Sequence, residues 1–468
     1  MSHNSASERG AFGSKFGFLM AATGSAVGLG NIWGFPYKMG TNGGFAFLVV
    51  YLILVALVGF AILIVELSIG RTTGKGAVGS YMALSRRFKW LGWLAFLSAF
   101  FIMTFYSVLG GYCIRYAVAN FGDLIGASFG TGELSAGSFF ASFIANQTAS
   151  IIYTLIFMII TAVIVMKGVS EGIESFSKTA MPLLFVMLLI VVIRSVTLPG
   201  AEEGLRFMFK PNLEPFKTDF FKVFSTASGQ MFFSLSLAMG AMITYGSYLQ
   251  KTDNIVRNAI LVPAADTFIA ILAGIAVLPA AFALGGEGAA MAGPKLLFIT
   301  LQHVFASMGA TGPLFGLIFY ILVIIAALTS AISLVEVITA FFLDAADARG
   351  KKANRKIVAA LVSLSIMAVA VFVAADGLGS TGFPTIMGYI WLDFMDLLSE
   401  GVMMPLGALL TAIFISMEYG LPNIAKEVRI GNNRFASYSF FAFSVRFIVP
   451  VVLLLVLYGQ LKGFGLLG

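Results

Sequence analysis

Cysteine, histidine and charged residues are all scarce in this chain. It contains one cysteine, Cys113, so no intrachain disulfide can form. Its two histidines, His3 and His303, stand far from that cysteine in the sequence, and no Cys/His set has the spacing of a metal site. We also find no Ser/His/Asp spacing of the esterase kind. These absences leave no credible catalytic set, and we predict that the protein is not an enzyme.

Only 11% of the 468 residues are charged, whereas 59% are hydrophobic, which excludes an ordinary soluble domain. Apolar runs of about 20 residues recur along the chain, and each is long enough to cross a bilayer. Lipid offers backbone groups no partners, and long continuous runs favour helices over a barrel. We therefore predict an all-α polytopic membrane protein with about eleven transmembrane helices. The predicted spans are 16–38, 43–69, 91–120, 151–167, 180–198, 224–249, 257–284, 313–343, 357–375, 385–416 and 436–459.

The distribution of lysine and arginine predicts the orientation of these spans. If the N-terminus is cytoplasmic, nineteen of these cations fall on the inside and six on the outside. This bias favours a cytoplasmic N-terminus and an extracytoplasmic C-terminus in the cell (inner, cytoplasmic) membrane. The polar residues 1–15 and the long apolar run after them argue against a cleaved signal peptide. The net charge of +7 then reflects topology, and no nucleic-acid partner is expected.

Two of the apolar segments contain helix breakers. GSAVGLGNIWGFPYK, Gly24 to Lys38, places four glycines and a proline in the first span, and SGQMFFSLSLAMGAMITYGSY, Ser228 to Tyr248, interrupts the sixth. An unwound segment at membrane depth exposes carbonyls that can bind cations and amides that favour an anion. Matching breaks in two halves predict an inverted repeat around a central site. The alternative is that the small residues only permit close helix packing.

We accordingly predict one transporter domain over residues 1–468. The first repeat of five spans covers about 12–198, the second covers about 224–416, and an additional helix covers 436–459.

Three segments resemble the neurotransmitter:sodium symporter family: GSAVGLGNIWGFPYKMGTNGGFAFL, GQMFFSLSLAMGAMITYGSY and ALTSAISLVEVITAFFLD. They occur in the family's order, and the bacterial amino-acid branch, with its eleven-helix members, is most similar. The resemblance implies a symporter that couples Na⁺ to an amino acid by alternating access in the lipid bilayer. Gly28 stands where the monoamine branch has an aspartate, so the substrate is expected to bring its own carboxylate. An apolar lining suggests a neutral, hydrophobic L-amino acid.

The resemblance also implies two sodium sites and a substrate site. The first sodium site takes Ala26, Asn31, Ser234 and Asp266, together with the substrate carboxylate. The second takes the carbonyls of Gly24, Val27 and Ala326 and the hydroxyls of Thr329 and Ser330. All of these are oxygen donors, which suit a hard cation. The substrate residues are Ser25, Ala26, Leu29, Gly30, Ile102, Tyr106, Phe233, Ser234, Ser236, Met239, Ser330 and Leu334. The alternatives are that Thr329 and Ser330 bond back to their own helix and that the apolar residues are ordinary core.

Three departures from the family pattern lead to further expectations. Asp266 replaces an asparagine of the chloride-dependent animal members, so we predict transport without chloride; the alternative is that it packs against a polar neighbour. Gly34 replaces the usual outer-gate arginine, and Lys38 is expected either to pair with Asp396 in its place or to extend to the outer surface. Glu336 replaces a glutamine of the family. It is expected either to carry a proton or to act as a structural hydrogen-bond acceptor.

The remaining expectations concern the inner gate and the class of function. Arg9 and Asp344 resemble the inner gate pair, with Tyr248 nearby. Glu66 is expected to brace the unwound segments, with a proton-linked role as the alternative. Two further functions remain open at this point: an amino-acid sensor or receptor with little turnover, and a proton-coupled carrier.

Overall fold

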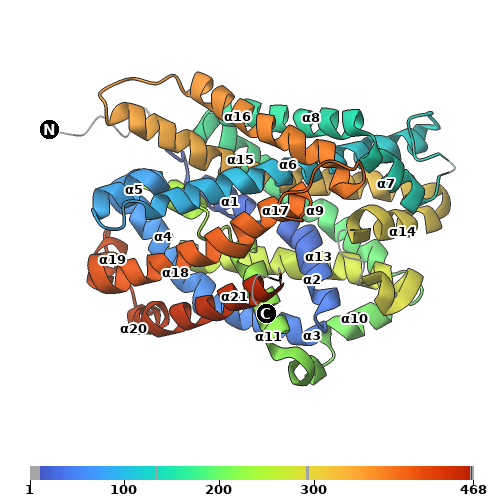
Figure 1. Cartoon of the computed structure of the whole chain (residues 1–468). Helices are drawn as coiled ribbons and strands as arrows, with labels where there is room; N and C mark the ends of the chain where they lie inside the picture. The colour runs from blue at the N-terminus through green and yellow to red at the C-terminus, as the bar shows by residue number, and fades with distance from the viewer. Residues whose placement is uncertain (1–10, 133, 291–294, 464, 466–468) are drawn as a thin grey trace.

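The computed structural model describes residues 11–132, 134–290, 295–463 and 465 (Figure 1). Arg9, predicted for the inner gate, lies outside these residues. Within them the chain is helical throughout and has no β-strand, only an isolated bridge between Ile386 and Tyr389. This agrees with the predicted all-α class, since a helix satisfies its backbone groups internally in lipid.

Nine helices among the described residues are long and apolar enough to cross a membrane. They are Phe45–Thr73 (α3, η2, α4), Leu91–Ile125 (α6), Gln147–Met166 (α8), Val169–Val196 (η3, α9), Ile255–Leu284 (within α13, Ile255–Ala290), Gly309–Asp347 (η5, α15), Arg355–Gly379 (α16, η6), Trp391–Tyr419 (α17, η7, α18, η8) and Tyr438–Gly463 (α20, η9, α21). A tenth is the bent pair Lys15–Ala26 (α1) and Gly30–Thr41 (η1, α2), which meet at 48°.

The predicted sixth span is a broken helix. It contains the end of α11 (Glu214–Ser234) and the short α12 (Ala241–Gly246), with an irregular segment between them. The part of α11 before residue 224 extends beyond the predicted span. Each of the eleven predicted spans therefore corresponds to helical structure, although the fifth begins at Val169 rather than near residue 180.

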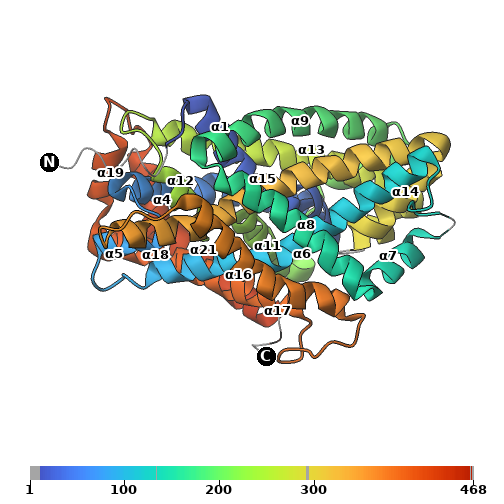
Figure 2. The ribbon, with the colours of Figure 1, turned by 90° about the horizontal axis from the view of Figure 1, so that it is seen from above.

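Shorter helices cover the two ends of the bundle. They are α5 (Ala77–Leu84), α7 (Ala136–Ala145), α10 (Ala201–Phe209), η4–α14 (Leu296–Ser307) and α19 (Leu421–Val428). Both ribbon views place α5 and α19 at one end and α7 and α14 at the other (Figures 1 and 2). By the charge distribution of the sequence, the end with α5 and α19 is the one predicted to face the cytoplasm.

The two breaks differ in how the backbone leaves the helix. After α1 the chain turns extended at Val27 (φ −76°, ψ 102°) and resumes as a π-helical turn at Gly30. After α11 it enters the left-handed region at Ser236 (φ 52°), Ala238 (φ 63°) and Gly240 (φ 80°). This region disfavours side chains with a Cβ. Local contacts must therefore hold the two non-glycine residues in place.

Glu66 on α4 supplies one of these contacts. Its Oε1 atom accepts the Ala238 N–H at 2.7 Å, and the residue is 2% exposed. This agrees with the expected bracing role. The Ser236 hydroxyl supplies a second contact by donating to the Ser25 carbonyl of α1 at 2.7 Å. The two breaks therefore lie against each other at the centre of the bundle.

Candidate substrate and sodium sites

A small cavity lies between the two breaks. Its lining is Ser25, Ala26, Gly28, Gly30, Ile102, Tyr106, Phe233, Ser236, Met239, Ser330 and Leu334. All predicted substrate residues except Leu29 and Ser234 are in this set, and Gly28 joins them. The cavity volume is about 20 Å³, enough for one water molecule, so an amino acid requires side chains of the lining to move apart.

The polar side of the cavity is built around the α1 break. The Tyr106 hydroxyl accepts the Leu29 N–H at 3.0 Å, so Leu29 acts through its amide beside the cavity. A Cβ atom on Gly28 would lie 2.6 Å from the Tyr106 hydroxyl oxygen, too close for any side chain without displacement. The Ser330 hydroxyl oxygen would be closer still, at 2.4 Å, so a larger residue here requires both hydroxyl groups of the cavity to shift. A hydroxyl and helix-start amides are groups that hold a carboxylate.

The opposite side of the cavity is apolar. Ile102, Met239 and Leu334 are buried there. Phe233 packs onto the second half of the broken first span, since a Cβ on Gly30 would come within 2.8 Å of its ring. This side matches an apolar side chain and offers no partner for a charged one.

The predicted first sodium site is a hydrogen-bonded cluster around Asp266. Asp266 is completely buried on α13. The Asn31 side-chain amide donates to its Oδ1 atom at 2.7 Å, and the Ser234 hydroxyl donates to its Oδ2 atom at 2.8 Å. Tyr51 donates to the same Oδ2 atom at 3.2 Å. Three of the four predicted ligands therefore meet, and the fourth, Ala26, is the last residue of α1.

The predicted second sodium site also assembles. The Thr329 hydroxyl lies 2.9 Å from the Ala326 carbonyl oxygen and 3.3 Å from that of Val27. The Ser330 hydroxyl lies 3.4 Å from the Gly24 carbonyl oxygen. A hydroxyl that bonds to the preceding turn of its own helix explains the contact of Thr329 with Ala326. It does not explain the contacts of these hydroxyls with the carbonyls of Gly24 and Val27. Hydroxyl and carbonyl oxygens of α1 and α15 therefore lie close together here, and oxygen is the donor that a hard cation prefers.

The outer gate differs from its expected form. No ion pair within the 4.0 Å limit joins Lys38 to Asp396, although both residues are described. The Lys38 ammonium lies 6.0 Å from the centre of the Phe233 ring instead. The structure thus shows Lys38 above the substrate cavity without the direct pair.

The inner gate contains an ion pair that the sequence did not reveal. Glu336, fully buried on α15, accepts the Tyr248 O–H at 2.5 Å and pairs with the Arg355 guanidinium of α16. Both carboxylate oxygens are engaged, which favours the structural role among the two expected for Glu336. Asp344 accepts the Gly76 N–H at 2.8 Å. Arg355 is the first residue of α16 and comes next to Glu336 only through helix packing, so the sequence gave no signal for this pair.

Glu174 is a second residue that the sequence analysis missed. It lies in η3, and its carboxylate accepts the Gly13 N–H at 2.6 Å and the Ser14 O–H at 2.9 Å. Lys178 forms an ion pair with it at 2.5 Å. Glu174 therefore holds the first turn of α1, where a negative charge is favoured by the helix dipole. In the sequence Glu174 stands among polar residues between the predicted spans 151–167 and 180–198, so no local signal marked it.

Comparisons with known proteins agree with this architecture. The pattern of the Sodium:neurotransmitter symporter family matches residues 9–128 and 141–465. A Bacillus subtilis protein called "Uncharacterized sodium-dependent transporter YhdH" is 36% identical over 448 residues, covering 95% of this chain and 96% of that protein. A Haemophilus influenzae protein called "Uncharacterized sodium-dependent transporter" is 35% identical over 465 residues, covering 97% of this chain and 98% of that protein.

A solved structure is also similar to this chain. The crystal structure of MhsT in complex with L-phenylalanine superposes with a TM-score of 0.86 at 38% sequence identity. The match covers 97% of this chain and 100% of that one. The likeness therefore extends over the whole bundle.

Proposed function

The chain belongs to the sodium:neurotransmitter symporter family, and on that premise we propose that it carries a neutral, hydrophobic L-amino acid with two sodium ions, independently of chloride. The family consists of transporters, which agrees with the prediction that the protein is not an enzyme. One observation carries the proposal: the substrate cavity and both predicted sodium sites adjoin the same break of α1. We place the protein in the inner membrane with a cytoplasmic N-terminus.

The break couples the substrate to sodium directly. In the proposal, the amino-acid carboxylate binds beside Gly28 and Tyr106, next to the ligands of the first sodium site. Each ligand then supplies an opposite charge to the other, so either one binds more tightly when both are present. Since Asp266 places a carboxylate in this cluster, a chloride ion is not needed to balance the charge.

The substrate class is supported by two features of the cavity and one relative. Gly28 has no room for an acidic side chain that could replace a substrate carboxylate. The apolar side of the cavity suits a hydrophobic side chain. The similar structure of MhsT was solved with L-phenylalanine. A bound amino acid of this kind requires Phe233 and its neighbours to move, as the cavity is small.

Replacement of Tyr106 by phenylalanine is expected to weaken binding of the amino acid by about 10- to 100-fold, the effect of losing a hydrogen bond to a charged group. The measurement is competition for labelled L-phenylalanine at saturating sodium. Tyr112→Phe is the matched control, since this tyrosine lies on the same helix and bonds only to Ser150, at 3.2 Å. Equal affinities of the two variants would contradict the carboxylate role of Tyr106.

Replacement of Glu174 by glutamine is expected to loosen the first turn of α1 and favour opening of the inner gate. The sodium concentration for half-maximal uptake should rise by roughly 3- to 10-fold, since a state that binds sodium poorly becomes more populated. Glu171→Gln, an exposed change of the same kind in the same turn, is the control. If the two variants need the same sodium concentration, Glu174 does not hold the gate.

The proposed function is tested by uptake into proteoliposomes. A mixture of amino acids is offered under an inward sodium gradient, an inward proton gradient or no gradient. We expect depletion of one or a few hydrophobic amino acids with sodium alone, also when gluconate replaces chloride. Depletion driven only by protons would identify a proton-coupled carrier. Sodium-dependent binding without depletion would identify a sensor, and either result would overturn the proposal.

A further inference from the structure

A second and larger cavity lies at the end of the bundle predicted to face the cytoplasm. Its volume is about 420 Å³, against about 20 Å³ for the substrate cavity. Three parts of the chain form it: the start of α1, the segment from Thr252 into α13, and Asn433. The lining is Lys15, Phe16, Phe18, Leu19, Thr252, Asp253, Asn254, Arg257, Asn258, Leu261 and Asn433. None of these residues belongs to the substrate or sodium sites.

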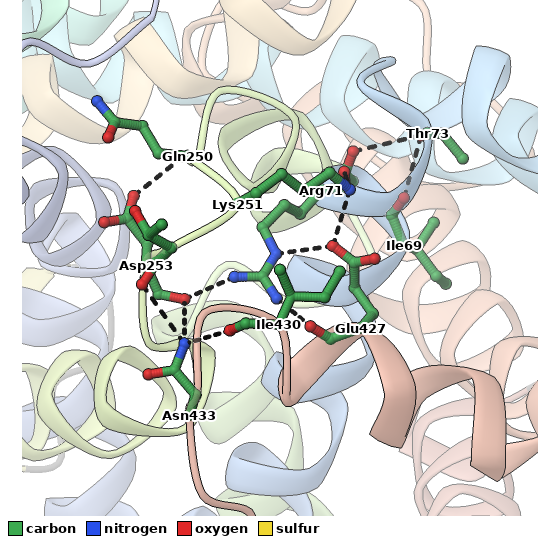
Figure 3. A network of polar contacts seen from close by, with 11 residues as sticks. Ile69, Arg71, Thr73, Gln250, Lys251, Asp253, Glu427, Ile430 and Asn433 are labelled. Atoms are coloured by element: carbon green, nitrogen blue, oxygen red, sulfur yellow. Dashed lines mark hydrogen bonds and ion pairs between the residues drawn. The ribbon is translucent and has the colours of Figure 1, made fainter.

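One wall of this cavity is fixed by a buried polar network (Figure 3). Arg71, whose side chain is fully buried, donates to the Asp253 carbonyl at 2.6 Å and pairs with Glu427 at 2.8 Å. Asn433 donates to the same carbonyl at 3.3 Å, and Lys251 pairs with Glu427 at 3.0 Å. The linker before α13 is thereby held in one conformation, and the cavity next to it is built into the fold.

Two cations of the lining have no acidic partner. Lys15 on α1 and Arg257 on α13 are exposed and form no ion pair within 4.0 Å in the part of the chain that is described, unlike the neighbouring Arg71 and Lys251. The only acid in the lining, Asp253, is 8% exposed and its Oδ1 atom is buried. Its other oxygen, Oδ2, accepts the Gln250 N–H at 3.0 Å, so this carboxylate is engaged within its own turn. The cavity lining thus combines these two cations with the side chains of Asn254 and Asn258, whereas the amide of Asn433 donates to the wall.

The other side of the cavity is apolar and continues onto the lipid-facing surface. Phe18, Leu19 and Leu261 line this side, and Phe16, which also lines it, is 55% exposed. Polar and apolar parts therefore meet in one hollow at the expected depth of the membrane–water interface. Basic pockets between helices on the cytoplasmic side are suited to phospholipid head groups.

We propose that this cavity binds an anionic phospholipid. Its phosphate lies between Lys15 and Arg257, with the side-chain amides of Asn254 and Asn258 as further donors, and its acyl chains follow Phe16 and Leu261. Lys15 and Arg257 can each form a charge-assisted hydrogen bond to the phosphate. We expect these bonds to be more favourable than leaving the two positive charges hydrated in the cavity. A bound lipid would join α1 to α13 next to the inner gate.

The experiment measures binding of phosphatidylglycerol to the delipidated full-length protein by native mass spectrometry. The variant Lys15→Gln/Arg257→Gln is compared with Arg86→Gln/Lys89→Gln, which removes two exposed cations at the same end outside the cavity. We expect phosphatidylglycerol affinity to fall by roughly 10- to 30-fold in the cavity variant and to change less than about 2-fold in the control. Equal losses in both variants, or no loss in either, would overturn the proposal.

Two further measurements complete the test. The first shows whether the cavity binds a lipid or a soluble phosphate, and the second shows whether the cavity variant is still folded. Glycerol phosphate has the same phosphate chemistry without acyl chains, and we expect it to bind at least about 100-fold more weakly than the lipid. If it binds as tightly, the site serves a soluble phosphate and the lipid proposal is wrong. Sodium binding of the cavity variant, equal to that of the unaltered protein, confirms that it is folded. Lipid binding is measured without transport. The lipid proposal can therefore be tested even if the proposed transport function is wrong.

Discussion

Replacement of Asp266 by asparagine is expected to abolish sodium-driven uptake in chloride-free medium and to restore part of it when chloride is added. The carboxylate is completely buried, and three hydroxyl or amide donors hold it within the proposed first sodium site. The asparagine keeps the shape but removes the negative charge that the sodium ion needs. Uptake without chloride should fall at least roughly 10-fold, as expected for loss of a charged partner in a buried cluster.

The control for this prediction is Asp347→Asn, an exposed aspartate at the end of α15. Its uptake should match that of the unaltered protein in both media. Equal uptake by the Asp266 variant with and without chloride, at the level of the control, would show that Asp266 only packs against its neighbours. A loss that chloride does not reverse would leave Asp266 as a sodium ligand but would remove the chloride argument.

Replacement of Thr329 by valine is expected to raise the sodium concentration for half-maximal substrate binding by at least about 10-fold. Valine has nearly the same volume, so packing is conserved while the hydroxyl oxygen is lost. That oxygen lies between α15 and the Val27 carbonyl of α1. Loss of this proposed sodium ligand is also expected to weaken the contact between the two helices. The measurement is sodium titration of labelled substrate binding on purified protein.

Thr339→Val is a matched control on the same helix. Thr339 is also buried, but its hydroxyl bonds only to the Val335 carbonyl of its own helix, at 2.8 Å. If both valine variants shift the sodium titration equally, the effect arises from general loosening of α15. A shift confined to the Thr329 variant supports the second sodium site.

The positions of the broken helices could be predicted because clustered glycines and a proline interrupt a helix even within an apolar span. Gly24 to Lys38 gave the first break, and the structure bends the chain there by 48°. The second break could be located but not described in detail. Its left-handed residues include Ser236 and Ala238, which a glycine-based expectation does not mark. Contacts with Glu66 and with α1 hold them, and such contacts are not encoded locally.

Charged pairs across distant segments were the main features that the sequence did not reveal. Glu174 meets the start of α1 across 160 residues, and Arg355 meets Glu336 from another helix. Their partners are set by how the helices pack, so neither spacing nor periodicity predicts them. At the outer gate, by contrast, the sequence suggested a charged pair that the structure does not contain. Helical periodicity put Lys38 on the face of Gly34 and suggested a pair with Asp396, but the structure has the Lys38 ammonium 6.0 Å from the centre of the Phe233 ring and in no such ion pair.

The central claim is that the substrate carboxylate and sodium bind together at the break of α1. Equilibrium binding of radioactive sodium to the purified protein tests it most directly, with L-phenylalanine or with phenethylamine, the same molecule without its carboxylate. The account predicts that sodium affinity rises at least about 10-fold with the amino acid and stays unchanged with the amine. Equal sodium affinity in the presence of both compounds, at concentrations where both bind, would contradict it.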